Sequence, residues 1–241
     1  MKINFLSFQD LNRKKFPGSM DPSEVYSFIY LLKKNKIDLV IESGRQYGYS
    51  TYFIGKYCNI NNIKFYSIDS NTDKKITFLS KKTLSKIKIK YVVSNFFFVI
   101  RKILDTYKYK KIALLVDGPK GLFAFCYCYS LLINYKNLKF VFFDNFLKSS
   151  NNFFKFLLFK KINNFRDLRY PLNIRNKLIY FNNKNRIHNS TKNKDNDFSF
   201  IFKYDLNLSY FSLFFSQLII IYSFLRLKRS RITRSYLNFR S

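Results

Sequence analysis

The sequence predicts a doubly wound α/β domain built on a mostly parallel sheet, and three observations support this fold class. From about Asp21 to Asn145, short apolar runs alternate with longer segments of helical length. Scarce acidic residues stand where four of the apolar runs end. Glycines, of which the chain has only 6, gather in the turns after the first and the fourth run. A chain of 241 residues is long enough for one such domain with a full core and a short appendage.

The expected elements follow this alternation in order. Strands are expected at Ile37–Glu42, Lys64–Asp69, Ile87–Val93, Lys111–Asp117 and Lys139–Asp144. Helices are expected at Asp21–Asn35, where Asp-Pro supplies the cap and the first turn, and at Ser50–Tyr57, Asp73–Ser85, Asn95–Tyr107 and Leu122–Asn134. Right-handed crossovers would bring the carboxyl ends of these strands to one edge of the sheet, where open α/β folds bind their ligands.

After Asn145 the alternation weakens. Lys177–Phe181 and Phe198–Tyr204 are expected to form two further strands, and an antiparallel pair at the sheet edge would bring the sheet to seven strands. The segment Leu206–Leu225 has no charged residue and runs directly into Arg226, Lys228, Arg229, Arg231 and Arg234. We therefore expect an N-terminal extension at residues 1–20, the α/β domain at 21–204, and an apolar helix with a basic tail at 205–241.

The formal net charge of +30 has two explanations. Such an excess is typical of proteins that bind nucleic acid or an anionic membrane surface. Lys, Asn, Ile, Phe and Tyr are also enriched together while Trp is absent, as a strongly AT-biased genome would cause in any protein. Cys58, Cys126 and Cys128 fit neither a disulfide framework nor a zinc site. No signal peptide is visible at Met1–Phe16, so the cytoplasm is the expected compartment.

The turn after the first strand has residues suited to a ligand site. It reads Glu42-Ser43-Gly44-Arg45-Gln46-Tyr47-Gly48-Tyr49-Ser50. Glycines allow the backbone to approach a ligand closely, and the free N–H groups of the next helix can receive a carboxylate. The spacing G-x-x-x-G lacks the pyrophosphate cradle of G-x-G-x-x-G, which favours a ligand without phosphates. Asp69 ends the second strand, where an acid can accept both ribose hydroxyls. The alternative is a plain tight turn and a helix cap.

Four features together resemble the catechol and caffeoyl-CoA O-methyltransferases, a group of class I S-adenosylmethionine-dependent methyltransferases. These features are Glu-x-Gly-x-x-x-Gly-Tyr-Ser from Glu42, the acid Asp69, Asp-x-x-Lys from Asp117, and the pair Asp144-Asn145. The likeness covers about Ile37 to Asn145. It implies a Rossmann-like sheet with an antiparallel edge. It also implies S-adenosylmethionine binding through Glu42, Gly44, Gly48, Ser50, Asp69 and Asn95.

The same resemblance implies a metal beside the methyl acceptor. In that group the acid after strand four and the Asp-Asn pair after strand five hold magnesium, which would make Asp117, Asp144 and Asn145 the ligands and Lys120 the general base. Magnesium prefers oxygen ligands, and a lysine beside a cation has its pKa lowered. One alternative is a metal-free enzyme in which Asp117 is the base or a substrate ligand. Another is that Asp117 and Asp144 only cap the helices that follow.

The expected function is O-methylation of a small molecule, with two alternatives. An RNA methyltransferase would explain the basic charge, although Asp117-Gly118-Pro119-Lys120 stands where base-amino methyltransferases have Asn/Asp-Pro-Pro-aromatic. A membrane-associated protein with a non-catalytic methyltransferase-like fold would explain Leu206–Leu225, which is about the length of a bilayer span. A core or interface helix explains the same segment. The basic tail is expected to bind an anionic membrane surface or RNA.

Overall fold

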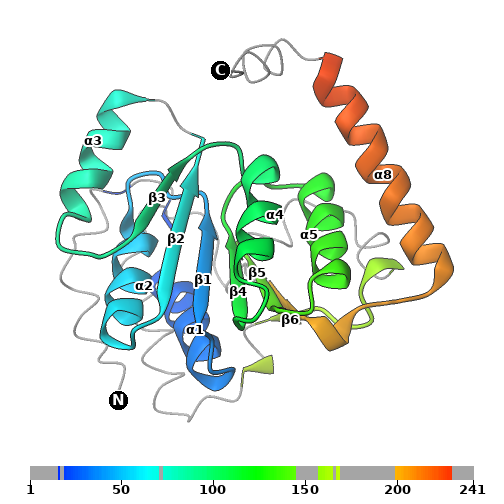
Figure 1. Cartoon of the computed structure of the whole chain (residues 1–241), viewed down its shortest axis with the longest axis horizontal. Coiled ribbons are helices and arrows are strands. Elements are labelled where there is room, and N and C mark those ends of the chain that lie inside the picture. Colours follow the sequence, from blue (N-terminus) through cyan, green and yellow to red (C-terminus); the bar gives the residue numbers. More distant parts are fainter. Residues whose placement is uncertain are drawn as a thin grey trace, which may run out of the picture.

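A computed structural model describes residues 16, 19–70, 73–144, 157–164, 167–168 and 199–229 of the chain. Parallel pairing joins the strands β1 (Leu39–Ser43), β2 (Lys64–Asp69), β3 (Lys90–Val93), β4 (Ile112–Val116) and β5 (Leu138–Phe143). The strand β7 (Ser199–Phe202) pairs antiparallel with β5, and the two-residue β6 (Asn163–Asn164) pairs antiparallel with β7. The strand order is β3-β2-β1-β4-β5-β7-β6 (Figure 1).

This topology confirms the predicted doubly wound, mostly parallel fold with an antiparallel edge. Each of the five predicted parallel strands is present, with ends that shift by up to three residues. Six strands of the sheet have at least 4 residues, and the predicted number of seven is reached only if the two-residue β6 is counted as a strand. The predicted strand at Lys177–Phe181 lies outside the described residues. The last strand ends at Phe202 instead of Tyr204, because Lys203–Asp205 form a 3-10 turn.

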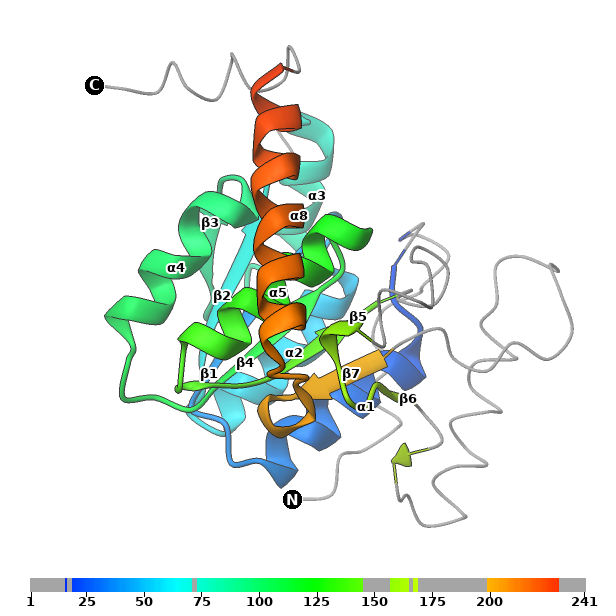
Figure 2. The ribbon, with the colours of Figure 1, turned by 90° about the vertical axis from the view of Figure 1, so that its right-hand side faces the viewer.

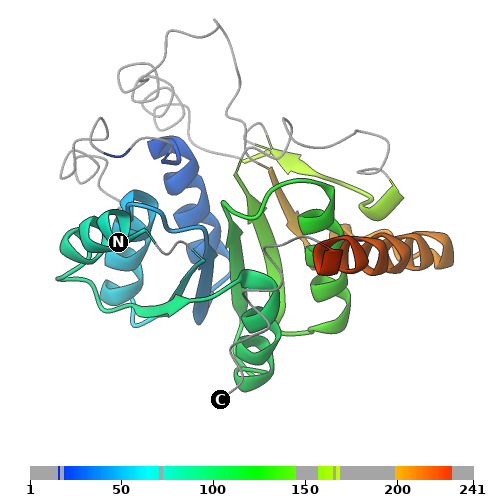
Figure 3. The ribbon, with the colours of Figure 1, turned by 90° about the horizontal axis from the view of Figure 1, so that it is seen from above.

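Helices cover both faces of the sheet, which explains why its central strands are buried and mostly apolar. The helices α1 (Pro22–Lys34) and α2 (Tyr49–Ile60) pack on one face, and α4 (Phe96–Thr106) and α5 (Leu122–Asn134) pack on the other (Figure 3). Every residue of β1 and β4 is buried. Successive side chains of a strand point to opposite faces, so Leu39 and Ile41 join the core under α4 and α5, while Val40 joins the core under α1 and α2.

Side chains at the helix starts satisfy backbone donors that have no partner inside the helix. Glu24 in the first turn of α1 accepts the N–H of Asp21 at 2.5 Å. The helix α3 (Lys74–Thr83) begins after Asp73, which accepts two N–H groups of its first turn. Asn95 accepts the N–H of Phe97 at 3.0 Å and so caps α4. These caps place the helix starts within one or two residues of their predicted positions.

The helix α8 (Tyr210–Arg229) lies against the outer side of α5 (Figures 1 and 2). Tyr129 of α5 donates a hydrogen bond to the carbonyl of Asn207, just before the helix. Ser212, Ser216 and Ile220 are buried on the inner side of α8. Within the described part of the chain, no helix has the length and apolarity that a bilayer crossing requires. The segment predicted at Leu206–Leu225 is thus helical from Tyr210 onward, and its buried side packs against α5.

Candidate functional site

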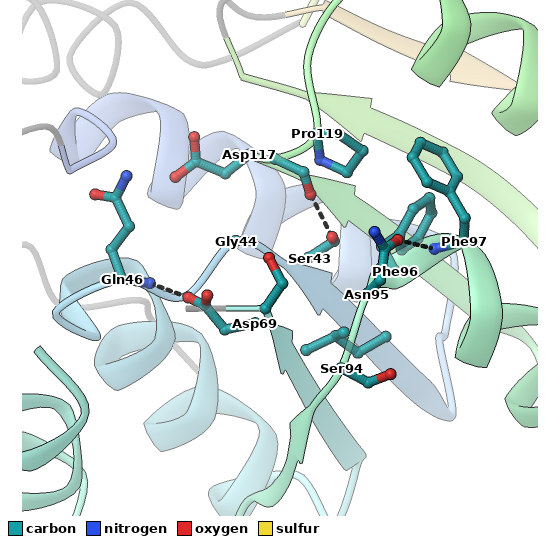
Figure 4. Close-up of a pocket in the computed structure, with 13 residues that line it drawn as sticks. Ser43, Gly44, Gln46, Asp69, Ser94, Asn95, Phe96, Phe97, Asp117 and Pro119 are labelled. Atoms are coloured by element: carbon teal, nitrogen blue, oxygen red, sulfur yellow. Dashed lines mark hydrogen bonds between the residues drawn. The ribbon is translucent and has the colours of Figure 1, made fainter. Parts of the chain in front are cut away.

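A pocket of about 280 Å³ opens at the carboxyl ends of the strands around β1 (Figure 4). β1 pairs with β2 on one side and with β4 on the other, so the chain changes direction across the sheet at this point. Open α/β sheets bind ligands at such a switch point. The pocket is lined by Ser43, Gly44, Gln46, Ile68, Asp69, Ser70, Ser94, Asn95, Phe96, Phe97, Asp117, Gly118 and Pro119. Of the sequence-predicted site residues, it brings together Gly44, Asp69, Asn95 and Asp117.

Gly44 allows the turn after β1 to contact the turn after β4. It has a φ of +95°, and a Cβ at this position would lie 2.7 Å from the amide nitrogen of Gly118. Neither backbone can give way easily, because Gly118 also donates its N–H to the carbonyl of Ser43 at 3.1 Å. Gly44 is therefore required for the close packing of two loops that form the floor of the pocket.

Asp69 ends β2 at the rim of the pocket, and its carboxylate is held by the turn between β1 and α2. The N–H of Gln46 donates to Oδ2 of Asp69 at 2.6 Å (Figure 4). Gln46 takes a positive φ of 45°, which directs its N–H across to the end of β2. Our sequence reasoning missed Gln46, although it lies inside the G-x-x-x-G turn. Arg45 beside it places its guanidinium over the ring of Tyr91.

Glu42 and Ser50, which we expected to contact the cofactor, lie beneath the pocket instead. The carboxylate of Glu42 is fully buried and accepts hydrogen bonds from Ser50 at 2.9 Å, Thr51 at 2.6 Å and Ser67 at 2.7 Å. Burial raises the pKa of Glu42, and the three hydroxyl donors oppose that rise. The strand alternation explains the placement, because Glu42 points to the same face as Val40, where the start of α2 supplies two of the hydroxyls and β2 supplies the third. Glu42 therefore ties α2 to the sheet.

Gly48, which we also expected to contact the ligand, lies outside the pocket lining. It precedes α2 with a φ of +88°, a conformation that favours glycine. A Cβ at Gly48 would lie 3.0 Å from Cδ1 of Leu84, which follows α3. The second glycine of the turn is thus explained by backbone conformation and by packing against Leu84.

Asn95 lines the pocket through the segment that connects β3 to α4. Because Oδ1 of Asn95 accepts the N–H of Phe97, its side chain caps the helix at the same time. Phe97 packs its ring 4.6 Å from that of Phe123 and 5.0 Å from that of Tyr127, measured between centroids. This side of the pocket is therefore an aromatic wall that α4 and α5 hold in place.

A cluster of charged residues adjoins the pocket at Asp117. The ammonium of Lys120 lies 3.1 Å from Oδ1 of Asp117 and 2.7 Å from Oδ2 of Asp144. Asp117 follows β4 and Asp144 follows β5, and these two strands are paired. The two carboxylates thus converge on one cation, as the predicted strand arrangement requires. The helix α5 begins after Gly121 without a side-chain cap, so Asp117 does not cap it.

Burial and mutual repulsion change the pKa values in this cluster. Burial and the neighbouring Asp144 raise the pKa of Asp117 well above its ordinary value. Burial and Asp144 also raise the pKa of Glu24 on α1. For Lys120, burial lowers the pKa, but the two carboxylates outweigh burial and the pKa is raised. The raised pKa favours the protonated form of Lys120 in this arrangement, and its role as a general base beside a metal ion stays a prediction.

Two of the three predicted magnesium ligands, Asp117 and Asp144, lie in the described part of the chain. Asp117 and Asp144 meet, but the cation between them is the Lys120 ammonium. Asn145, the third predicted ligand, lies outside the described residues. Among the residues that the structure describes, no group of three or more His, Cys, Asp or Glu side chains is arranged to hold a metal ion. The described residues form an ion-paired cluster with a lysine at its centre.

Neither a family model nor a curated protein sequence matches this chain. Three of the similar solved structures are methyltransferases. The SAH-bound PaMTH1 of Podospora anserina is 13% identical with a TM-score of 0.46, covering 60% of this chain and 63% of its own length. A protein described as a caffeoyl-CoA O-methyltransferase from Staphylococcus aureus is 15% identical with a TM-score of 0.48, covering 83% and 91%. The O-methyltransferase TomG of Streptomyces achromogenes, in complex with SAM, is 12% identical with a TM-score of 0.46, covering 83% and 89%.

The strand order of this chain, with β7 antiparallel to β5, is that of a Rossmann-like doubly wound sheet. The solved structures are 12% to 15% identical to the chain and have TM-scores below 0.5, so they do not indicate what it binds or does. What the chain binds and does is therefore inferred from its own pocket and from the charged cluster beside it.

Proposed function

We propose that this chain is an S-adenosylmethionine-dependent methyltransferase that methylates a hydroxyl oxygen of a small molecule. The observation that carries the proposal is the charge of the pocket lining. Asp69 and Asp117 contribute carboxylates, and no Lys or Arg stands among the described lining residues. Phosphate-bearing ligands need cations or a glycine cradle, whereas carboxylates attract a sulfonium or an amino group. S-adenosylmethionine carries both of these cationic groups and no phosphate.

The two ends of the pocket suit different parts of such a ligand. Asp69 is oriented by the N–H of Gln46 and stands at the end of β2, where an acid can accept hydrogen bonds from two ribose hydroxyls. Phe96 and Phe97 supply an apolar wall of the kind that receives an adenine ring. Asp117 comes from the other side of β1. We therefore propose that Asp69 binds the nucleoside and that Asp117 faces the methyl acceptor.

Asp117 is also the best candidate for the base. When bound, S-adenosylmethionine supplies an activated methyl group on a sulfonium. The pKa of Asp117 is raised by burial and by Asp144, and a raised carboxyl pKa makes a better base at neutral pH. We propose that a carboxylate oxygen of Asp117 accepts the proton of the acceptor hydroxyl. Lys120 forms ion pairs with Asp117 and Asp144 and acts as a positioning residue.

Magnesium was also expected, but the described residues are not arranged to bind it. Asp117 and Asp144 already share the Lys120 ammonium, so a divalent ion bound between them would have to displace it. Magnesium is bound in nearly octahedral geometry by several oxygens. A metal-independent reaction through Asp117 agrees better with this arrangement. A calorimetric titration with magnesium chloride tests this point, and we expect no saturable heat.

Binding of the cofactor tests the main proposal. Calorimetric titration of the full chain with S-adenosylmethionine should give saturable binding. Asp69→Asn should weaken that binding by roughly 10- to 100-fold, because hydrogen bonds to a charged group contribute about 1.5 to 3 kcal/mol. Asp105→Asn removes the same charge from the exposed side of α4 and is the matched control. Absence of saturable binding by the folded parent, or equal affinities for the two variants, would contradict the proposal.

The alternative of RNA methylation is less well supported by the pocket. Its motive is the basic charge of the chain, and the described lining contains carboxylates where an RNA phosphate would need cations. The alternative of a non-catalytic protein predicts that S-adenosylmethionine does not bind. The same titration therefore distinguishes it from a methyltransferase.

A further inference from the structure

The outer side of α8 is apolar and exposed. Five side chains on this side form what we call the outer stripe: Phe211, Phe214, Leu218, Ile221 and Leu225. Each of them exposes 46% to 62% of its surface. They are spaced alternately 3 and 4 residues apart, which places them along one face of the helix. The outer stripe is therefore continuous over most of the helix.

The inner side of α8 is already used by the fold. Ser212, Ser216 and Ile220 are buried there, and the helix contacts α5 along this side (Figure 2). A helix that is apolar on both sides is ordinarily covered on both sides. In the part of the chain that the structure describes, the side chains of the outer stripe remain exposed. Contiguous apolar surface of this kind marks an interaction site.

The charges around α8 indicate what covers the stripe. Six basic residues and no acidic residue follow Leu225 in the sequence, and the whole chain carries a net charge of +30. Two copies of so basic a chain repel each other, whereas an anionic surface attracts it. The segment Leu206–Leu225 also has no charged residue, so it lacks the flanking ion pairs that set the register of paired helices. A fluid anionic surface needs no such register.

We propose that the outer stripe of α8 docks onto the surface of an anionic lipid membrane. The helix would lie in the plane of the interface, with α5 and the sheet behind it and the basic residues after Leu225 among the lipid headgroups. This agrees with the finding that no described helix suits a bilayer crossing. The inference rests on α8 alone and does not depend on the proposed function.

The absence of Trp from the chain allows a direct test. Leu218→Trp in the full chain places a single tryptophan in the outer stripe, at a position that is 46% exposed. Vesicles of phosphatidylcholine with about one third phosphatidylserine should shift its emission to shorter wavelength, and brominated acyl chains should quench it. Vesicles of phosphatidylcholine alone should bind it more weakly, and added salt should weaken the binding to anionic vesicles.

Two double variants distinguish membrane binding through the outer stripe from nonspecific adsorption of exposed apolar side chains. Phe214→Ser with Ile221→Ser should lower the partition onto anionic vesicles at least about tenfold, because two large apolar side chains no longer enter the interface. Phe78→Ser with Tyr109→Ser is the control, since these side chains are 65% and 87% exposed elsewhere on the fold. The control should partition like the parent. Because all four positions are exposed, both variants should retain the helical circular dichroism of the parent.

Three results would overturn the proposal. The first is tryptophan emission that anionic vesicles neither shift nor quench. The second is a blue shift that appears without vesicles as the protein concentration rises, together with a dimer mass by light scattering, which would assign the stripe to a second copy. The third is loss of RNA retention in the stripe variant while its vesicle partition stays equal to that of the control.

Discussion

The ammonium of Lys120 lies 2.7 Å from Oδ2 of Asp144, although 24 residues separate the two in the sequence. This contact joins the loops that follow β4 and β5 and neutralises a buried carboxylate. The same ammonium lies 3.1 Å from Oδ1 of Asp117, which lines the pocket.

Lys120→Met should lower both stability and turnover. The carboxylates of Asp117 and Asp144 would repel each other without the ammonium, which should cost roughly 1 to 3 kcal/mol of the free energy of unfolding. We expect less than for a fully buried pair, because the Lys120 side chain is 40% exposed. Turnover should fall more than cofactor affinity. Lys120→Arg keeps the charge, so equal unfolding energies for the Met and Arg variants would show that the ion pair contributes nothing.

Glu24→Gln should make the protein more stable at mildly alkaline pH. The pKa of Glu24 in the folded chain is raised well above its ordinary value of 4.5. Its favourable contribution is therefore fully present below about pH 4.5 and is lost as the pH rises through the folded-state pKa. The Gln side chain still accepts the N–H of Asp21 but has no charge to bury. The free energy of unfolding, measured from pH 5 to pH 8, should increasingly favour the variant, and a difference that does not change with pH would contradict this prediction.

Gly44→Ala and Gly48→Ala should have different consequences. Both glycines have a positive φ, so alanine should cost roughly 1 kcal/mol or more in stability at either position. Only at Gly44 does the added Cβ meet backbone, at 2.7 Å from the nitrogen of Gly118 in the pocket floor. Cofactor affinity should therefore fall for Gly44→Ala and stay within about twofold for Gly48→Ala. A larger loss of affinity in Gly48→Ala would restore the ligand contact that we first expected there.

Glu42→Gln and Asp69→Asn should separate a structural acid from a binding acid. Glu42 accepts three hydroxyl donors in the core, and an amide can accept only part of that set, so we expect a loss of roughly 1 to 3 kcal/mol in the free energy of unfolding. Asp69 lies at the pocket rim and should affect affinity much more than stability. Chemical denaturation and calorimetry on the same samples measure both quantities. The assignment fails if the two variants show the reverse pattern.

Several parts of this protein follow from its sequence alone. The strands could be located because parallel strands between two helix layers are buried on both faces and so appear as uninterrupted apolar runs. Asp69 and Asp117 could be placed at the ligand edge because right-handed crossovers send all parallel strands the same way. Gly44 was expected at the pocket because scarce glycines in a turn after a strand indicate a special backbone conformation.

The tertiary structure decided which of the predicted residues face the pocket and how they are charged. The strand alternation turns Glu42 toward α2, and the hydroxyls that donate hydrogen bonds to its carboxylate come from both α2 and β2. Burial lowers the pKa of Lys120, but it is raised because Asp144 and Asp117 both reach it, and Asp144 also raises the pKa of the buried Glu24 from the first helix. Local patterns determine where strands and turns occur. Burial and the meeting of side chains from distant elements determine protonation, because a pKa depends on every charge and every solvent-excluding atom nearby.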